Sequence, residues 1–190
     1  KVLYFSSDRG DKLDAKMLPP DFRIMQHDYT QKDIYKYVLE SGLIVRITDL
    51  PFSDETSPRE EASGENLILI SDLNGINNIY TKSLVSNGSD NSILNSELRP
   101  ITNSISGLYQ LSLSKDTKKL VFSSLYESVF NIFMLDNPFE PKTELDTIPR
   151  TLFFTKLEAL RNKTPETKEV VTETNQNNIL PDDEDEIQIF

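Results

Sequence analysis

Few side chains in this sequence have the types and spacing that acyl-transfer catalysis needs. The only histidine, His27, precedes Asp28, and a paired His and Asp would supply two members of a catalytic triad. The third member is missing, because no Gly-x-Ser-x-Gly nucleophile elbow occurs in the 190 residues. We therefore interpret His27 as a loop histidine without a chemical role.

Ser112 and Lys115 match the Ser-x-x-Lys spacing of serine acyl-enzymes. That spacing places both side chains on one face only when the residues form a helix. Here the sequence of residues 109–119, YQLSLSKDTKK, predicts a strand that runs into a turn. The two side chains should then point to opposite faces, and the pair is not expected to catalyse a reaction.

Metal binding is no better supported than acyl transfer. Asp72, Asn74 and Asn77 surround Gly75 with oxygen ligands, as in part of a calcium loop, but the later bidentate Glu of an EF-hand is missing. A hairpin turn accounts for the same residues. With one His and no Cys, a transition-metal site is not expected either. The sequence thus predicts no catalytic residue, no metal and no cofactor in this chain, while the enzymatic status of a longer protein is left open.

The elements that surround these residues follow a recurring pattern. Residues 67–80, LILISDLNGINNIY, contain an apolar strand, a tight turn and a second strand, which is a hairpin pattern. The same outline returns in residues 119–133, KLVFSSLYESVFNIF, and its first half in residues 1–10, KVLYFSSDRG. Residues 66–84 and 119–136 are therefore predicted to form antiparallel hairpins that superpose in register.

Aligning the serine that ends each first strand also aligns a polar residue, an isoleucine and an aromatic residue in each second strand. The repeat positions are Ser7, Asp8, Arg9, Gly10, Asp33, Tyr35, Ser71, Asp72, Gly75, Asn78, Tyr80, Ser124, Asn131 and Phe133. The first copy carries an insertion within residues 11–31. Repetition of a short polar side chain at a strand entry favours a structural role, in which it accepts hydrogen bonds from turn amides.

A further extended segment follows each second strand, at residues 42–50, 97–104 and 149–156, and each contains an Arg shortly before a Thr. Four short strands per unit, with loop insertions between units, are typical of a β-propeller. Each blade needs a neighbour, because one sheet cannot cover both of its own faces. The predicted fold is all-β, a partial β-propeller of about three four-stranded antiparallel blades.

The repeats resemble the WD-like propeller repeat of TolB and its relatives over about residues 1–140. That repeat contains Ser-Asp-Arg-x-Gly followed by Asp-Ile-Tyr, and the first copy has Ser-Asp-Arg-Gly at residues 7–10 and Asp-Ile-Tyr at residues 33–35. The third copy departs most, with Leu125 in place of the Asp and Phe133 in place of the Tyr. The family tryptophan is missing, Glu60 and Leu111 are near its expected positions, and Thr117 replaces a turn glycine.

Two regions are predicted. Residues 1–156 are expected to form the blades, with the first blade incomplete at the N-terminus because the chain opens inside a strand pattern. Residues 157–190 are expected to be an irregular, flexible, acidic linker or tail, since they are mostly polar and include five consecutive acids at 182–186. The final apolar residues, IQIF at 187–190, are a candidate for pairing with a sheet edge.

Composition restricts the partners. The formal net charge of −11 argues against nucleic acid, whose phosphates need a basic surface. No apolar run is long enough for a transmembrane helix, and no signal sequence is visible in this segment. The resemblance implies a periplasmic or other cell-envelope protein.

The hypothesis that fits these observations is a non-catalytic propeller scaffold that binds another protein or an adjoining domain. The insertion is the first candidate for partner contact, through Phe22, Ile24, Met25 and Tyr29, because loops on a rigid scaffold often carry recognition. The alternative that the resemblance leaves open is the gating propeller of a prolyl oligopeptidase-like or tricorn-like serine peptidase, with its catalytic domain outside this chain.

Overall fold

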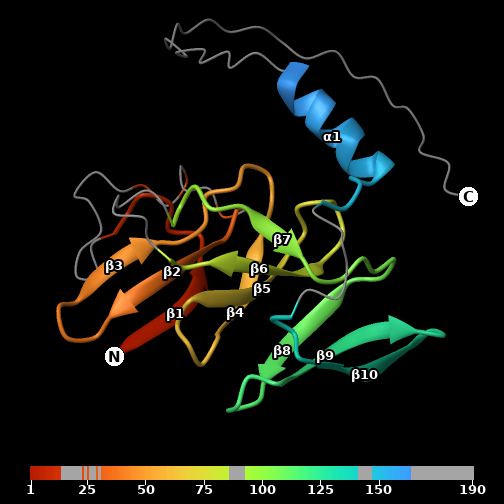
Figure 1. Cartoon of the computed structure of the whole chain (residues 1–190). Helices are drawn as coiled ribbons and strands as arrows, with labels where there is room; N and C mark the ends of the chain where they lie inside the picture. The colour runs from red at the N-terminus through yellow and green to blue at the C-terminus, as the bar shows by residue number, and fades with distance from the viewer. Residues whose placement is uncertain are drawn as a thin grey trace, which may run out of the picture.

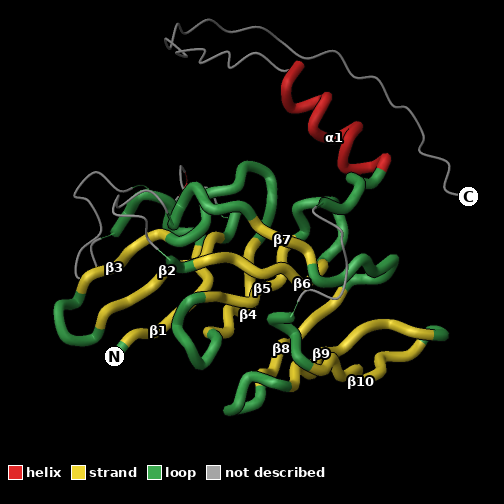
Figure 2. Tube along the Cα trace, viewed as in Figure 1, coloured by secondary structure: helices red, strands yellow, loops and turns green. Residues whose placement is uncertain are grey.

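The computed structural model describes residues 1–13, 23, 25, 29, 31–85, 93–140 and 147–163. Strands dominate these residues, as Figure 2 shows, and they form three successive antiparallel sheets (Figure 1). The strands are β1 (Val2–Ser7), β2 (Asp33–Val38), β3 (Leu43–Arg46), β4 (Glu55–Glu60), β5 (Asn66–Ser71), β6 (Asn78–Ser83), β7 (Leu98–Pro100), β8 (Leu108–Leu113), β9 (Lys119–Tyr126) and β10 (Val129–Asp136).

Each sheet corresponds to one sequence repeat, and we call the sheets blades 1, 2 and 3. Blade 1 has the order β1-β2-β3, blade 2 has β4-β5-β6-β7, and blade 3 has β8-β9-β10. Blade 2 is a complete four-stranded meander. Among the described residues, blade 1 has no strand inside β1 and blade 3 has none outside β10. The all-β partial propeller is therefore confirmed, with one four-stranded and two three-stranded blades.

The three sheets share one register. Ser7 pairs with Asp33 across β1 and β2, and Ser71 pairs with Asn78 across β5 and β6. In blade 3 the corresponding cross-strand pair joins Ser124 to Asn131. The predicted hairpins within residues 66–84 and 119–136 are confirmed, and equivalent positions can be read across blades from these pairs.

A bulge recurs on the inner strand of blades 2 and 3. The pairing of β4 with β5 shifts between Thr56 and Arg59, and that of β8 with β9 shifts between Tyr109 and Ser112. Ser57 and Gln110 lie inside the bulges with φ of 54° and 60°, a left-handed conformation that is uncommon for residues other than glycine. The register also makes Leu113, rather than Leu111, the equivalent of Glu60.

Two apolar layers join the three blades. Between blades 1 and 2, the buried residues are Ile34, Ile47, Leu67 and Leu69. Between blades 2 and 3, they are Ile68, Ile70, Ile79, Leu108, Leu111 and Leu120. Alternate residues of β5 therefore contribute to opposite layers, because successive side chains of a strand point to opposite faces. Blade 2 is buried on both faces.

The extended segment predicted at residues 149–156 is wrong, because helix α1 (Leu152–Lys163) begins there. The Arg-Thr pair at 150–151 resembles the earlier copies, yet Thr151 acts at the helix start, where its hydroxyl accepts a hydrogen bond from the Phe154 backbone N–H at 3.2 Å. The helix crosses residue 156, at which the sequence divides blades from tail. That division stays a prediction, and residues 164–190 lie outside the described residues.

Candidate functional site

The Asp or Asn at the start of the second-last strand forms hydrogen bonds with a threonine that follows the last strand in blades 1 and 2. The Thr48 hydroxyl accepts a hydrogen bond from the Ile34 N–H at 2.8 Å, and the Thr102 hydroxyl accepts one from the Ile79 N–H at 2.9 Å. Each threonine hydroxyl in turn lies within hydrogen-bonding distance of the preceding Asp or Asn, at 3.3 Å from Asp33 and 3.0 Å from Asn78. These contacts are internal to the fold, so they offer no surface for a ligand.

Charged and aromatic groups cover part of the outer face of blade 1, on which Leu3 is 56% exposed. The Arg9 guanidinium lies over the rings of Phe5 and Tyr35, at 5.8 and 5.9 Å from their centroids. Tyr35 is fully buried and donates a hydrogen bond from its hydroxyl to the Gly10 carbonyl at 2.8 Å. Arg46 forms an ion pair with the buried Asp33 at 2.5 Å and further ion pairs with Asp11 and Asp49.

A buried carboxyl group lies at the inner end of blade 2. Glu55 is 0% exposed, and its Oε1 atom accepts hydrogen bonds from the Ser53 and Ser71 hydroxyls at 2.7 and 2.8 Å. Its Oε2 atom and the Tyr80 hydroxyl are buried without a hydrogen-bond partner in the described part of the chain. Burial raises the pKa of Glu55 to about 8, against the opposing effect of the two serines. Sequence reasoning missed this residue, because glutamate at a strand start is usually exposed.

A second buried charge, Lys82, lies elsewhere in the same blade. Its ammonium donates to the carbonyl oxygens of Ser96 and Leu94 at 2.5 and 3.3 Å. Burial lowers the pKa of Lys82 to about 8. Because Lys82 is only 3% exposed, it is not accessible to a substrate.

The residues considered for chemistry in the sequence do not come together. Ser112 lies on the exposed side of β8 and Lys115 in the following turn, while His27 and Asp28 lie outside the described residues. The carboxylate of Asp72 accepts the backbone N–H of Asp54 at 2.7 Å, as a turn residue does. Within the described ranges, no group of three or more His, Cys, Asp or Glu side chains is arranged to hold a metal ion.

Helix α1 is anchored beside the β5–β6 turn. The Thr151 backbone N–H donates to the Asn74 carbonyl at 2.8 Å, and Phe154 is 7% exposed. Gly75 has a φ of 93°, and a Cβ atom there would lie 2.8 Å from the Cβ of Phe154. The close approach of helix and turn therefore requires glycine at position 75.

A cavity of about 440 Å³ lies between the helix and the loops of blades 1 and 2. Its lining residues come from the β3–β4 loop, the β5–β6 turn, the end of the insertion and the helix, and they are Gln31, Phe52, Ser53, Asp54, Asp72, Gly75, Phe153, Phe154, Leu157 and Arg161. The Arg161 guanidinium lies 4.9 Å from the centroid of the Phe52 ring. We call the exposed residues of this region, Phe52, Leu152, Phe153, Leu160 and Arg161, the loop-end surface.

Of the four residues predicted to contact a partner, Met25 and Tyr29 are described, and they are 93% and 53% exposed. Phe22 and Ile24 lie outside the described residues. The insertion ends at Gln31, whose side chain donates to the Leu50 carbonyl at 3.0 Å and lines the cavity beside α1. The role of Met25 and Tyr29 in binding stays a prediction.

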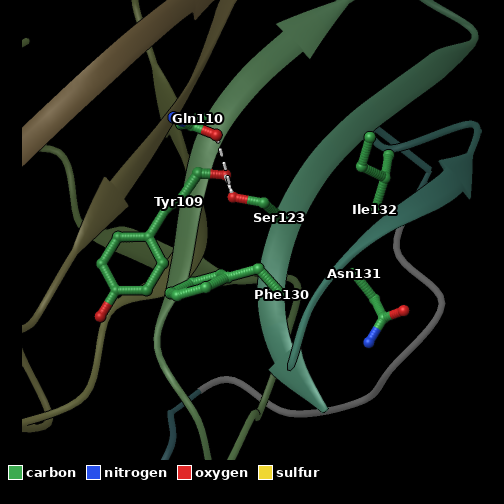
Figure 3. Close-up of a pocket in the computed structure, with 6 residues that line it drawn as sticks. All are labelled: Tyr109, Gln110, Ser123, Phe130, Asn131 and Ile132. Atoms are coloured by element: carbon green, nitrogen blue, oxygen red, sulfur yellow. Dashed lines mark hydrogen bonds between the residues drawn. The ribbon is translucent and has the colours of Figure 1, made fainter. Parts of the chain in front are cut away.

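Blade 3 carries a second hollow on the face turned away from blade 2. This groove, of about 480 Å³, is drawn in Figure 3 and is lined by Tyr109, Gln110, Ser123, Phe130, Asn131 and Ile132. The rings of Tyr109 and Phe130 meet edge to face, with centroids 6.2 Å apart. The dashed line in Figure 3 marks the contact between Ser123 and Gln110 at 3.2 Å. None of the six side chains is charged.

The arrangement defines a partial β-propeller, and solved structures of propeller proteins are among those similar to it. A TolB-type structure from Agrobacterium tumefaciens is 21% identical with a TM-score of 0.45, over 56% of this chain and 38% of its own. TolB from Acinetobacter baumannii is 21% identical with a TM-score of 0.44, over 60% of this chain and 28% of its own. The tricorn protease is 24% identical with a TM-score of 0.41, over 64% of this chain and 10% of its own.

The chain spans less than two fifths of the length of each of these three structures. The fold is defined by the shared register of the three blades rather than by the likenesses. No protein-family model matches the chain. The search of curated proteins also gives no match. Among the described helical residues, no helix is both long and apolar enough to cross a membrane.

Proposed function

We propose that this chain is a non-catalytic binding module, in which propeller blades hold a protein-binding surface at the loop end. The observation that supports this proposal is the exposure of large apolar side chains on an anchored helix. Leu152, Phe153 and Leu160 are 83%, 75% and 64% exposed, although α1 is fixed to blade 2 through Thr151 and Phe154. Several large apolar side chains exposed on one fixed element favour an interaction site there.

The composition of the loop-end surface suits a protein partner. Aromatic and arginine side chains dominate the binding energy of many protein interfaces, and here Phe52, Phe153 and Arg161 lie together around the cavity. Phe52 has a φ of 69°, so the β3–β4 loop presents its ring from an unusual backbone conformation. The partner is another protein or an adjoining domain of the same polypeptide. Met25 and Tyr29 of the insertion are further candidates for contact, since they are 93% and 53% exposed.

We place this module in the bacterial cell envelope, following the TolB-like resemblance of its repeats. The absence of an assembled nucleophile and base within the described residues favours binding over catalysis. The alternative, a gating propeller of a serine peptidase, differs in the domain that would adjoin it. Both functions use the blades as a scaffold.

The loop-end surface is tested by affinity purification from the source organism. Phe153→Glu combined with Leu160→Glu should reduce the recovery of a stoichiometric partner by at least about 10-fold, because each change places a charge in an apolar contact. Ile105→Glu is the matched control, since Ile105 is 97% exposed on the connection between blades 2 and 3. Identical recovery with all three proteins, each folded by circular dichroism, would contradict the proposal.

The non-catalytic part has a separate test. A fluorophosphonate probe reports an activated serine hydroxyl, and no serine of this chain should react stoichiometrically with it. Ser112→Ala and His27→Ala should leave partner recovery unchanged. Labelling of a single serine in the chain would overturn the assignment of this chain as non-catalytic.

A further inference from the structure

The cavity between α1 and the loops of blades 1 and 2 is lined by two carboxylates that form no ion pair with a described residue. Asp54 comes from the β3–β4 loop and Asp72 from the β5–β6 turn. The Asp72 Oδ1 atom accepts the Asp54 backbone N–H at 2.7 Å, and the Asp54 Oδ1 atom accepts the Lys32 backbone N–H at 2.8 Å. No other described residue donates to either Oδ2 atom, so both atoms can accept a hydrogen bond from a ligand.

The two carboxylates repel each other. Burial raises the pKa of Asp72, and the nearby charge of Asp54 raises it further, against the hydrogen bond from the Asp54 backbone N–H. Both side chains are half-buried, so water screens the repulsion only in part. A cation bound between them would relieve this repulsion, whereas an anion would add to it. The electrostatics of the cavity therefore favour a positively charged group.

The shared register shows that these carboxylates are not needed to form a blade. Gly107 precedes β8 as Asp54 precedes β4, and Leu125 follows the aligned serine of blade 3 as Asp72 follows that of blade 2. Blade 3 pairs its strands at this end with neither carboxylate. The two charges are thus a property of blade 2 and not a requirement of the sheet.

The aromatic rings around the cavity already contact guanidinium groups of this chain. Arg161 lies 4.9 Å from the centroid of the Phe52 ring, and Arg150 lies 5.4 Å from that of Phe154. Such contacts are favourable because the face of an aromatic ring is negative. Phe153, the third ring in the lining, is 75% exposed and has no cation over it among the described residues. This ring can therefore accept a cation from outside the chain.

Arg161 does not neutralise the two carboxylates. It is the only basic residue among the described residues that line the cavity, and it contacts Phe52 without an ion pair to Asp54 or Asp72. An acidic group that approached Arg161 would meet two carboxylates in the same cavity, in a chain whose formal net charge is −11. A basic group is complementary both to the cavity and to the whole chain.

We propose that the cavity beside α1 receives a basic side chain, lysine or arginine, from the protein that binds the loop-end surface. The charged end of this side chain binds the carboxylates of Asp54 and Asp72, and its stem lies against Phe153. A cavity of about 440 Å³ has room for one such side chain. The inference rests on the proposed protein-binding function, and it adds the chemistry that the partner must present.

A small probe tests the charge of the occupant directly. N-acetyl-arginine amide carries the guanidinium group without charged termini. In backbone amide NMR spectra of the whole isotope-labelled chain, this probe should shift the signals of Asp54, Asp72 and Gly75 until they saturate. N-acetyl-glutamine amide, a neutral analogue, should leave these signals unchanged. Binding of the arginine probe should weaken as the salt concentration rises, because half-buried charges are partly screened.

Matched variants identify the residues that bind the probe. Asp54→Asn combined with Asp72→Asn removes both charges but keeps an acceptor oxygen for each backbone N–H, and it should weaken binding at least about 5-fold. Asp116→Asn is the control, since Asp116 is exposed in the β8–β9 turn and also accepts a backbone N–H, from Lys118 at 3.2 Å. Phe153→Leu keeps an apolar side chain without the ring, and it should weaken binding about 2- to 5-fold. Thermal unfolding confirms that each variant is folded.

The same variants separate this inference from the proposed function. Recovery of the partner should fall with the paired Asp54→Asn and Asp72→Asn changes and stay unchanged with Asp116→Asn. If Phe153→Glu with Leu160→Glu removes the partner while the paired asparagine changes leave its recovery unchanged, the loop-end surface stands and the basic occupant is wrong. If no variant affects recovery, the proposed function fails, whatever the probe shows.

Two results with the probes would overturn the inference. One is the absence of a saturable shift with both N-acetyl-arginine amide and N-acetyl-lysine amide. The other is a shift of the same signals by N-acetyl-glutamate amide that Arg161→Gln removes, which would assign the cavity to an acidic group. Binding of the arginine probe that persists unchanged in the paired asparagine variant would place the cation elsewhere and would contradict the inference as well.

Discussion

Blades 2 and 3 share one register, and they differ in the side chain that fills the same buried position. In blade 2 that side chain is Glu55, whose carboxyl group accepts hydrogen bonds from Ser53 and Ser71. In blade 3 it is Leu108, which is 3% exposed. The two positions are equivalent because Glu55 pairs with Ser71 and Leu108 pairs with Ser124.

In blade 3 the two equivalent serines are hydrogen-bonded without a carboxyl group between them. Ser106 and Ser124 correspond to Ser53 and Ser71, and their hydroxyls lie 3.0 Å from each other. The Ser124 hydroxyl also donates to the Gly107 carbonyl at 3.0 Å. A direct contact between hydroxyls therefore replaces the two bonds to Glu55. The same backbone supports a titratable interior in one blade and an apolar one in the next.

Blades 2 and 3 also differ on the sheet face that carries Ile79 in β6 and Ile132 in β10. Ile79 is covered by blade 3, while Ile132 is not covered by any described element. The burial of one repeat position thus changes completely with the presence of a following sheet. At this position the burial of the side chain is therefore due to the neighbouring blade and not to strand pairing.

The largest expected effect is the difference in the free energy of unfolding between alanine variants of these two isoleucines. Ile79→Ala should lower the free energy of unfolding by about 3 kcal/mol, because it leaves a cavity between two blades. Ile132→Ala should change it by less than about 0.5 kcal/mol, since the side chain is exposed in the monomer. Denaturant unfolding at a dilution that keeps the chain monomeric measures both. Equal losses in the two variants would mean that the equivalent faces are not differently buried.

The buried carboxyl group should make the stability of the protein depend on pH. In the folded chain the pKa of Glu55 is about 8, above the value of about 4.3 for an unfolded glutamate. Between these values the folded state holds the extra proton, so the free energy of unfolding falls as pH rises, by up to about 1.4 kcal/mol per pH unit. Unfolding by urea, followed from pH 5 to pH 8 (about the range of the shift), measures the slope.

Glu55→Gln is the control for this slope, because glutamine keeps the acceptor oxygen for Ser53 and Ser71 and does not titrate. The difference in unfolding free energy between wild type and variant should change across the same pH range. Lys82, whose pKa is lowered to about 8, is present in both proteins, so its own titration cancels in that difference. A difference that stays constant with pH would show that Glu55 is ionised in the folded chain.

The recurrence of short polar and aromatic residues was sufficient to predict the hairpins and their register. Residues such as Ser71 and Asn78 stand at strand ends, where chain geometry limits the residue types, so their spacing reports the turn between them. The fourth strand of blade 2 was also predictable from the Arg-Thr pattern. The same pattern failed at residues 150–151, because the threonine that ends a blade strand serves equally well as a helix cap.

The buried and bare surfaces could not be predicted from the sequence. Glu55 is buried by residues of other strands, and nothing in its local sequence distinguishes it from the exposed Glu60. The anchoring of α1 depends on Gly75, which lies far from the helix in sequence. The left-handed conformations at Ser57 and Gln110 could not be predicted, because neither residue is a glycine or an asparagine. Each of these features arises from contacts between distant segments.

The smallest expected effect concerns the turn that precedes the second strand of blades 2 and 3. In blade 2 this turn contains Gly64 with a φ of 77°, and its N–H donates to the Glu61 carbonyl at 2.9 Å. In blade 3 Thr117 takes the same place with a φ of 57°, and its N–H donates to the Ser114 carbonyl at 2.9 Å. A β-branched residue in a left-handed conformation is strained.

Thr117→Gly should therefore raise the free energy of unfolding by up to about 1 kcal/mol, because the relief of strain exceeds the added chain entropy of glycine in the unfolded state. The reciprocal change, Gly64→Thr, should lower it by a similar amount. Steric conflict does not explain that loss, since a Cβ atom at residue 64 would have the Glu60 Oε1 atom at 3.8 Å, which is an ordinary contact. Thermal unfolding of the two variants measures both signs, and a destabilised Thr117→Gly would show that the threonine hydroxyl, which donates to the Asp116 carbonyl at 2.8 Å, outweighs the backbone strain.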